Sequence, residues 1–396
     1  MKVLFLSNEQ FLPLSGGGSI GNYKLVKKMA ERGHEVTVAT PLYLGVEEAR
    51  RIETEHNIRL RPFSPYYMHR NISLRGPKYV LYSILFAFHL LRLLLEDRYD
   101  ALFIRNCLLC YPAVLFKPFV KSVYAVSMTD FITGLLHEKR AYPAPVLKTL
   151  FWFERFIPRF CDLVFVITPE MKRLLVEGGC QPSRIHVSYD GVDTGIFNPD
   201  GIDDADVGLI RERYGIERRI VVFHGAIVFT NDAALKKLLT IIDTVLEKSD
   251  DIAFVLIGEG RSYDDLKARL QSDRVIFPGY VPHEEIPKHL AAADVGIIPY
   301  EHTFNTDIII TLKLLEYLAM GLPVVSTDLK SIRELFGVYD FVRLSDSTEE
   351  FADYVIEFAG RGKSREAMEL IRERYGWDRV TETIVEAVER KLGPSR

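Results

Sequence analysis

The chain has 396 residues, which is enough for two domains of ordinary size. Its 48% hydrophobic and 26% charged residues are typical of a globular protein with a buried core, and they exclude a disordered or fibrous chain. The net charge of −4 conceals a basic segment, because residues 59–173 hold 17 Lys and Arg against 8 Asp and Glu, which suggests an anionic partner. The sequence has no zinc-finger or RNA-binding signature, so nucleic acid is not the expected partner.

The first half of the chain alternates between buried strands and helices. Residues 2–7 form an apolar strand that starts directly after Met1, so no signal peptide and a cytoplasmic location are expected. Three glycines, Gly16, Gly17 and Gly18, then predict a loop that lets the backbone approach a ligand closely, followed by a helix at 20–32. A ligand-free connection is the alternative. Their spacing is not G-x-G-x-x-G, so a nicotinamide cofactor is not indicated.

Further strands and helices follow in the same alternation. Strands are expected at 35–39, 101–104, 123–126, 162–168 and 185–188, with helices at 79–95, 147–160 and 171–178. The pair Cys107 and Cys110 lies in an apolar run without a second pair or nearby histidines, which favours buried thiols over a zinc site. The order of elements predicts a Rossmann-like sheet.

A Pro-, Gly- and Asp-rich stretch at 198–206 marks the expected domain boundary, with a first domain at 1–198 and a second at 199–376. The alternation then restarts, with strands at 220–224, 253–257, 275–277 and 295–299 and helices at 233–248, 263–270 and 286–293. A last amphipathic helix within 377–396 is expected to pack back on the first domain. The sequence therefore predicts an α/β protein of two doubly wound domains, with small-molecule sites at the carboxyl ends of the strands.

The stretch TLKLLEYLAMGLPVVST at 311–327 predicts a helix, a glycine stop at Gly321 and a buried strand. Lys313 and Glu316 lie three residues apart, so they share one face of the first turns of this helix. Free N–H groups and partial positive charge at a helix start favour an anion such as phosphate, and Lys313 adds a full charge. Glu316 can accept hydrogen bonds from hydroxyl groups. The alternative is an ordinary helix whose Lys and Glu pair in solvent.

Several further motifs, together with this helix, carry a family resemblance. They are DGVDTGIFNP at 190–199, FVLIGEG at 254–260, FPGYVPHEEIP at 277–287, ADVGIIPY at 293–300, KLLEY at 313–317 and GLPVV at 321–325. In this order they resemble the retaining glycosyltransferases of family 4, also called glycosyl transferases group 1, over nearly the whole chain. The resemblance implies the GT-B fold, in which two Rossmann-like domains face each other across a cleft.

The resemblance also implies a set of donor-binding residues in the second domain. Tyr280 and Val281 match the segment along the base, and Glu316 matches the residue that grips the ribose hydroxyls. The diphosphate would be held by Thr311, Leu312 and Lys313, with Gly225 at the end of the first strand of this domain.

In the first domain, Gly16, Gly17 and Gly18 match the loop that closes over the phosphate and sugar. Asp130 and His137 follow a strand where the family places polar residues near the reacting sugar, so they are the expected catalytic residues together with Lys313.

Three departures from the family pattern concern this site. The first of two glutamates usually found eight residues apart is Ile308 here, and the adjacent Asp307 would point elsewhere. No basic residue stands around Ala226 and Asp232, where the family has Arg and Lys, so Lys313 is the expected phosphate cation. The usual His-Asp pair of the first domain reads Met128-Thr129-Asp130.

The implied activity is transfer of a hexose-type sugar, with retention of configuration, from a nucleotide sugar to a glycan or lipid-linked acceptor, with UDP the favoured nucleotide. The implied arrangement of helix amides and Lys313 requires no divalent metal, so no metal or other cofactor is expected. A nucleotide-sugar epimerase or phosphorylase is one alternative. The missing glutamate and basic residues motivate another, a catalytically silent protein that binds a nucleotide sugar or scaffolds a partner.

The basic segment also predicts contact with a membrane. It contains RPFSPYYMHR at 61–70, where aromatic and basic residues interleave, and the apolar helix at 79–95. Aromatic side chains with Lys and Arg suit an anionic membrane interface. We therefore expect peripheral attachment to the inner face of the cell membrane. The alternative is that the helix at 79–95 is a core helix of the first domain.

Overall fold

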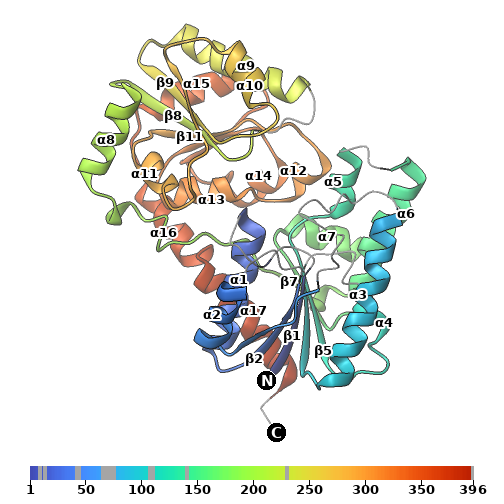
Figure 1. Cartoon of the computed structure of the whole chain (residues 1–396). Coiled ribbons are helices and arrows are strands. Elements are labelled where there is room, and N and C mark those ends of the chain that lie inside the picture. The colour runs from blue at the N-terminus through green and yellow to red at the C-terminus, as the bar shows by residue number, and fades with distance from the viewer. Residues whose placement is uncertain are drawn as a thin grey trace. The chain divides into compact units, whose positions relative to one another are not determined.

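The computed structural model describes residues 1–7, 11, 16–40, 46–63, 77–105, 112–138, 142–227 and 232–393. Its contacts divide the chain into two compact units. The first unit contains residues 1–190 together with 377–396, and the second contains residues 191–376. Figure 1 shows a sheet covered by helices in each unit. All strand pairs are parallel, so the expected α/β class with two Rossmann-like units is confirmed.

The first unit is built on a seven-stranded sheet with the order β3-β2-β1-β4-β5-β6-β7. Its strands are β1 (Lys2–Ser7), β2 (Glu35–Ala39), β3 (Ile58–Leu60), β4 (Ala101–Arg105), β5 (Val123–Met128), β6 (Leu163–Val166) and β7 (Ile185–Val187). Its helices are α1 (Gly16–Glu31), α2 (Val46–Glu55), α3 (Pro77–Glu96), α4 (Pro112–Leu115), α5 (Ile132–Glu138), α6 (Ala144–Phe156), α7 (Pro169–Glu177) and α17 (Trp377–Leu392), with 3-10 turns η1 (Ile157–Phe160) and η2 (Pro182–Arg184).

The central strands of this sheet are buried on both faces, which explains why they are continuous apolar runs. Helix α17 packs on α1, and its apolar positions Trp377, Ile384 and Val388 join the core of the first unit. Glu389 of α17 accepts hydrogen bonds from Arg32 and from His34. The last helix of the chain, red in Figure 1, therefore belongs to the unit with which the chain begins, in blue.

The glycine run does not form the predicted loop. Helix α1 begins at Gly16, so Gly16, Gly17 and Gly18 form its first turn instead of preceding a helix at residue 20. Glycine costs roughly 1 kcal/mol relative to alanine inside a helix, but the first turn lacks most backbone hydrogen bonds and tolerates it best. The backbone that the three glycines leave open to close approach is therefore the N-terminus of α1.

The second unit is built on a six-stranded sheet with the order β10-β9-β8-β11-β12-β13. Its strands are β8 (Arg219–His224), β9 (Ile252–Ile257), β10 (Val275–Gly279), β11 (Val295–Ile298), β12 (Val324–Ser326) and β13 (Val342–Leu344). Its helices are α8 (Asp204–Tyr214), α9 (Asp232–Lys248), α10 (Tyr263–Arg269), α11 (Ile286–Ala291), α12 (Phe304–Ile308), α13 (Leu312–Ala319), α14 (Lys330–Phe336), α15 (Thr348–Ala359) and α16 (Arg365–Arg374), with the 3-10 turn η3 (Pro199–Gly201).

The structure moves the expected boundary at residue 198 to the peptide between Asp190 and Gly191. The amide of Val192 donates to the carbonyl of Tyr375 at 2.8 Å, and the buried Phe197 ring lies 5.2 Å from the His283 ring. These contacts attach residues 191–198 to the second unit. The Asp-rich stretch expected to be a linker instead starts α8, whose first turn is stabilised by acidic side chains.

Candidate functional site

Three strands of the second sheet end at glycines with positive φ. Gly225, Gly258 and Gly279 follow or close β8, β9 and β10, with φ of 116°, 133° and 77°. The Gly225 amide donates to Ile257 O at 3.0 Å, and the Gly258 amide donates to Gly279 O at 2.9 Å. A Cβ atom at Gly258 would lie 1.9 Å from Gly225 O, so a side chain there would collide with backbone. These glycines let the three strand ends pack closely at the carboxyl edge.

Lys313 is buried at the same edge, with 7% of its surface exposed. Its Nζ lies 4.0 Å from the centre of the Phe223 ring and 4.9 Å from that of Tyr300, which follows β11. A Cβ atom at Gly225 would lie 3.3 Å from this Nζ, so the glycine leaves room for the ammonium group. The cation is thus held by ring faces, an interaction that strengthens as water is removed.

Glu316, one turn later on α13, is also buried. Its Oε1 lies 3.0 Å from His283 Nε2, and its Oε2 lies 3.2 Å from His224 Nε2. Burial acts to raise the pKa of this carboxyl, but the hydrogen bond with His283 and the nearby His224 and Lys313 lower the pKa overall. Glu316 is therefore an ionised acceptor inside the protein.

The two side chains do not form the solvent-exposed pair of an ordinary surface helix. Helix α13 is buried from Lys313 to Ala319, and its Tyr317 packs where Gly296 of β11 has no side chain. The Tyr317 hydroxyl accepts from the His224 amide at 3.1 Å. Packing of Tyr317 against the sheet fixes the helix, and this turns both charged residues toward the strand ends.

The other predicted residues of the second unit lie at the same edge. Thr311 is the N-cap residue of α13, and its side chain makes no capping hydrogen bond to the amides that follow it. Leu312 opens the helix and is half-buried. Tyr280 follows β10 with 70% of its surface exposed, and its amide donates to Glu259 Oε1 at 3.3 Å. Val281 next to it is half-buried.

Two of the departures from the family pattern have a structural outcome. Ile308 is buried at the end of α12, and the neighbouring Asp307 accepts from His302 at 2.9 Å and caps Lys330 N, so its carboxylate does point elsewhere, as predicted. His302 also lies 2.9 Å from Asp346. Neither residue replaces the missing glutamate.

A further cation lies at this edge that sequence reasoning missed. Lys237 of α9 donates to Thr327 Oγ1, just beyond β12, at 3.1 Å, and burial lowers the pKa of its amine. Lys237 comes five residues after Asp232, beyond the stretch around Ala226 and Asp232 in which the motif places its basic residues. Lys237 lies in the second turn of α9, the helix that follows β8 in the chain, and this position could have predicted a cation near the carboxyl edge.

In the first unit, Asp130 follows β5 and is half-buried, and His137 is exposed in the last turn of α5. The structure places both after the same strand, as predicted. Gly16, Gly17 and Gly18 lie at the start of α1, and residues 12–15 before them lie outside the described residues.

Sequence reasoning also missed Glu154 of α6, which is 1% exposed. Its carboxylate accepts from the amides of Ile132 at 2.7 Å and Thr133 at 3.1 Å, and from the Thr133 hydroxyl. Burial raises the pKa of Glu154 to about 7, although these hydrogen bonds oppose the shift. The residue caps the helix that follows Asp130, and only the packing of α6 on α5 reveals it.

The described residues contain no group of three or more His, Cys, Asp or Glu side chains arranged to hold a metal ion. That the reaction needs no metal stays a prediction. No helix in the described part of the chain combines the length and the apolar content that a bilayer-spanning segment needs. Cys161 and Cys180 are buried thiols, whereas Cys107 and Cys110 lie outside the described residues.

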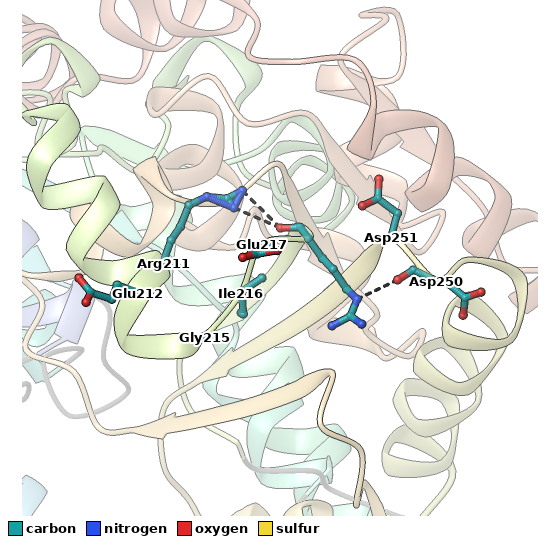
Figure 2. Close-up of a pocket in the computed structure, with 8 residues that line it drawn as sticks. Arg211, Glu212, Gly215, Ile216, Glu217, Asp250 and Asp251 are labelled. Carbon is teal, nitrogen blue, oxygen red and sulfur yellow. Dashed lines mark hydrogen bonds between the residues drawn. The ribbon is translucent and has the colours of Figure 1, made fainter.

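An open pocket lies at the amino ends of strands β8 and β9, opposite the carboxyl edge (Figure 2). It is lined by residues at the end of α8, the turn into β8 and the turn into β9. Its guanidinium groups are occupied by backbone carbonyls, because Arg211 donates to Arg218 O at 3.2 Å and Arg218 donates to Asp250 O at 2.9 Å. This pocket lies at the amino ends of the strands, so it is separate from the residues above.

The chain matches two family models and is similar to several known proteins. A model described as Glycosyltransferase Family 4 matches residues 15–195, and one described as Glycosyl transferases group 1 matches residues 218–360. Mannosylfructose-phosphate synthase of Agrobacterium fabrum is 30% identical over 44% of this chain and 39% of its own length. A putative teichuronic acid biosynthesis glycosyltransferase of Bacillus subtilis is 28% identical over 40% of this chain and 38% of its own.

The alignments thus span about two fifths of the length of these relatives. Among solved structures, Anabaena HepE in complex with UDP aligns over 98% of this chain and 99% of its own, with a TM-score of 0.69 at 17% identity. At that identity the likeness shows the fold. Two parallel-sheet units, each matched by its own family model, lead to one conclusion: the chain belongs to the group 1, family 4 glycosyltransferases, which have the GT-B fold.

Proposed function

We propose that this chain transfers a hexose-type sugar, with retention of configuration, from a UDP-sugar to a glycan or lipid-linked acceptor. The observation that carries the proposal is the pair of buried charges at the start of α13. Lys313 and Glu316 are 7% and 8% exposed and belong to one helix start at the carboxyl edge of the sheet. Burying charge is costly, so such groups usually serve a ligand or a pairing.

The second unit would bind the donor. The amides at the start of α13 and the ammonium group of Lys313 suit a diphosphate, because a helix N-terminus and a cation both stabilise anions. Glu316, ionised and buried, suits two ribose hydroxyls. Tyr280, mostly exposed beyond β10, offers a ring and backbone for the base. UDP is favoured because related folds bind it, as in the Anabaena protein.

During transfer, the bond between the anomeric carbon and the diphosphate oxygen breaks, and a bond to the acceptor oxygen forms. The diphosphate gains negative charge as it leaves, and Lys313 with the helix amides would stabilise that charge in a largely dry site. Such preorganised groups supply the largest catalytic contribution in many enzymes. Asp130 of the first unit would orient the acceptor hydroxyl or accept its proton first. The proton would end on the released diphosphate or in solvent.

Product analysis by mass spectrometry tests the proposal. The protein is incubated with UDP-, GDP- and ADP-sugars and either a lipid extract or soluble sugars. We expect a new glycoside and one molecule of free nucleoside diphosphate per glycoside, with the α configuration of the donor kept in the product. Isomerised donor without acceptor would indicate an epimerase, and donor binding without any product would indicate the silent protein. Activity that chelators abolish would contradict a metal-independent reaction.

We further propose that the first unit meets an anionic membrane surface. Helix α3 has apolar residues on two faces: Phe86 and Leu90 are buried, whereas Phe88 and Leu95 are 66% and 78% exposed. Ile84 and Leu91 continue the exposed face. The buried face fits the alternative of a core helix, and the exposed apolar face is what supports membrane contact. The interleaved segment at 64–70 lies outside the described residues.

A second exposed apolar surface lies on α6 and η1. Trp152 is 54% exposed and stacks on Phe156 with ring centres 4.5 Å apart, and Arg159 lies over the Phe156 ring at 4.8 Å. Exposed Lys148 is on the same helix. An aromatic surface bearing cations favours the headgroup region of an anionic bilayer over a second protein copy, since each basic residue near such a surface contributes about 1 kcal/mol.

Flotation with vesicles tests membrane contact. We expect binding to vesicles with anionic lipid, weaker binding at high salt, and none to neutral vesicles. Phe88→Ser and Trp152→Ser should each reduce binding, whereas Val338→Ser, at a position in the second unit that is 83% exposed, should not. Unchanged binding in both first-unit variants would contradict the proposed surface. Self-association that these variants abolish would point to a second copy instead.

A further inference from the structure

The carboxylate of Glu316 lies between two histidines from different parts of the second unit. His224 ends β8, whereas His283 belongs to the segment after β10, two residues beyond Val281. Each histidine meets a different carboxylate oxygen, at 3.2 Å and 3.0 Å. His283 hydrogen-bonds to Oε1, whereas His224 Nε2 lies near Oε2 without making a hydrogen bond, so the carboxylate keeps acceptor positions for ligand hydroxyls.

The two histidines differ in burial and in the direction of their pKa shifts. His224 is buried, its ring meets Tyr317 edge to face at 5.0 Å, and burial lowers its pKa to about 4, which keeps it neutral. His283 has 41% of its side chain exposed and lies beside the Phe197 ring. The hydrogen bond with Glu316 raises the pKa of His283.

The charged groups around His283 act in the same direction. Glu316 faces it from α13, Glu284 follows it in its own segment, and Asp193 faces it from the start of the unit. His224 is the group across the carboxylate, and it carries no charge near neutral pH. His283 is thus the histidine of this pair whose pKa is raised, whereas burial lowers the pKa of His224.

We propose that His283 is a positioning residue, which fixes the Glu316 carboxylate for the ribose hydroxyls and ties it to the Tyr280–Val281 segment that would contact the base. The inference rests on the donor site proposed above. One side chain would then align the acceptor for the sugar of the nucleoside with the backbone for its base. Because His283 contacts the carboxylate and not the reacting atoms, its loss should alter donor affinity more than the rate of the bound complex.

The direction of the pH effect follows from the hydrogen bond. A protonated His283 makes a charge-assisted bond to Glu316, which is roughly twice as strong as a neutral bond. As pH rises through the raised pKa of His283, the bond weakens and the carboxylate becomes less fixed. Donor affinity should therefore be highest on the acid side of that pKa and fall on the alkaline side.

Titration calorimetry tests this with UDP-glucose, GDP-glucose and ADP-glucose from about pH 6 to about pH 9, a range across which histidines change charge. Diphosphate diesters are suitable probes because they lack the phosphate ionisation near pH 6 of a phosphomonoester. The proteins are the wild type, His283→Gln and Glu316→Gln. His302→Gln is the matched control, since His302 also bridges two carboxylates and also has a raised pKa.

For the tightest probe, we expect wild-type affinity to fall as pH rises and His283→Gln to bind about tenfold more weakly at the acid end. The variant should show a flat profile over this range, and KM should rise with kcat nearly unchanged. His302→Gln should keep the wild-type profile. Equal melting temperatures exclude misfolding as the cause.

The outcomes separate this inference from the proposed function. If Glu316→Gln weakens binding while His283→Gln keeps both the affinity and the pH profile of the wild type, the positioning role is wrong and the donor site stands. If Glu316→Gln has no effect, or no probe binds the wild type, the donor site itself is wrong and the role of His283 falls with it.

Discussion

The carboxyl edges of the two sheets differ in how their polar residues are held. In the second unit, Lys313 and Glu316 are buried on a helix that packs against the sheet. The Phe223 ring contacts Lys313, and two histidines contact Glu316. In the first unit, Asp130 is half-buried after β5 and His137 is exposed. The difference suits a division of labour. A donor that carries the same diphosphate and ribose in every turnover can be met by a rigid site built into the fold.

The residues proposed for the acceptor are less buried than Lys313 and Glu316, although buried Arg105 donates to Ser127 Oγ at 3.0 Å at the same edge of the first sheet. Glu154 holds the first amides of α5, the helix that follows Asp130, but it lies in the interior. Under the proposed function, acceptor recognition would fall to exposed residues of the first unit. The comparison predicts that variants of the second unit mainly alter donor affinity, and that variants of the first unit mainly alter turnover or acceptor use.

The largest expected effect is at Lys313. Lys313→Met keeps most of the volume but removes the charge, so kcat/KM should fall by about 10²–10³ and the donor should bind at least about tenfold more weakly. Steady-state kinetics and calorimetry measure both. Lys237→Met is the matched control, since Lys237 is also a partly buried cation at this edge. A larger loss in the control would make Lys237 the phosphate cation.

Asp130 should come next, with a different signature. Asp130→Asn should lower kcat by about 10²-fold, as expected for a residue that orients or deprotonates a hydroxyl, and leave donor affinity unchanged. His137→Gln, measured in the same way, tests the other predicted residue of this unit. Full turnover of Asp130→Asn with a lower melting temperature would make Asp130 a helix cap. The prediction that first-unit variants mainly alter turnover would then be wrong for this residue.

Two glycines at positive φ, Gly225 and Gly33, offer a matched pair of variants for testing the site around Lys313. Gly225→Ala and Gly33→Ala both place a side chain at positive φ, 116° and 82°, which costs about 1–3 kcal/mol of stability. The added Cβ at Gly225 would also lie 3.3 Å from Lys313 Nζ, whereas nothing lies within 4 Å at Gly33. Both variants should melt earlier, but only Gly225→Ala should weaken donor binding. Equal donor affinity in the two would show that Lys313 tolerates crowding.

The smallest expected effect is a pH dependence in the first unit. The pKa of Glu154 is raised to about 7 from an ordinary 4.5, so the folded protein binds a proton that the unfolded chain releases. Stability should therefore fall as pH rises from about 4.5 to about 7, by up to about 3 kcal/mol. Glu154→Gln removes this dependence.

The variant should accordingly gain thermal stability relative to the wild type between pH 5 and pH 8, measured as the difference in melting temperature. Donor affinity, a property of the other unit, should not change. A constant difference in melting temperature across this range would mean that Glu154 does not change its protonation there.

The order of the elements could be predicted from the sequence, because strands of parallel sheets are buried on both faces and become continuous apolar runs. β1 and β2 have the predicted bounds, and α13 with the strand after it lies where the spacing placed it. Short elements such as α12, β13 and η3 were missed, since a few residues carry too little periodicity. The longer helices α2, α8, α15 and α16 were not predicted either. The start of α1 was misplaced because glycines also occur in the first turn of a helix.

The spacing of Lys313 and Glu316 predicted a charged helix start at α13, and the motif order assigned these residues to a donor site. Their partners could be identified only from the folded structure. His224 and His283 contact Glu316 although they lie 92 and 33 positions earlier in the sequence. Phe223 contacts Lys313 from 90 positions earlier. Contacts of this kind depend on the strand order β10-β9-β8-β11-β12-β13, which brings distant strand ends to one edge. Local spacing carries no record of that order, so burial, charge state and pairing had to come from the fold.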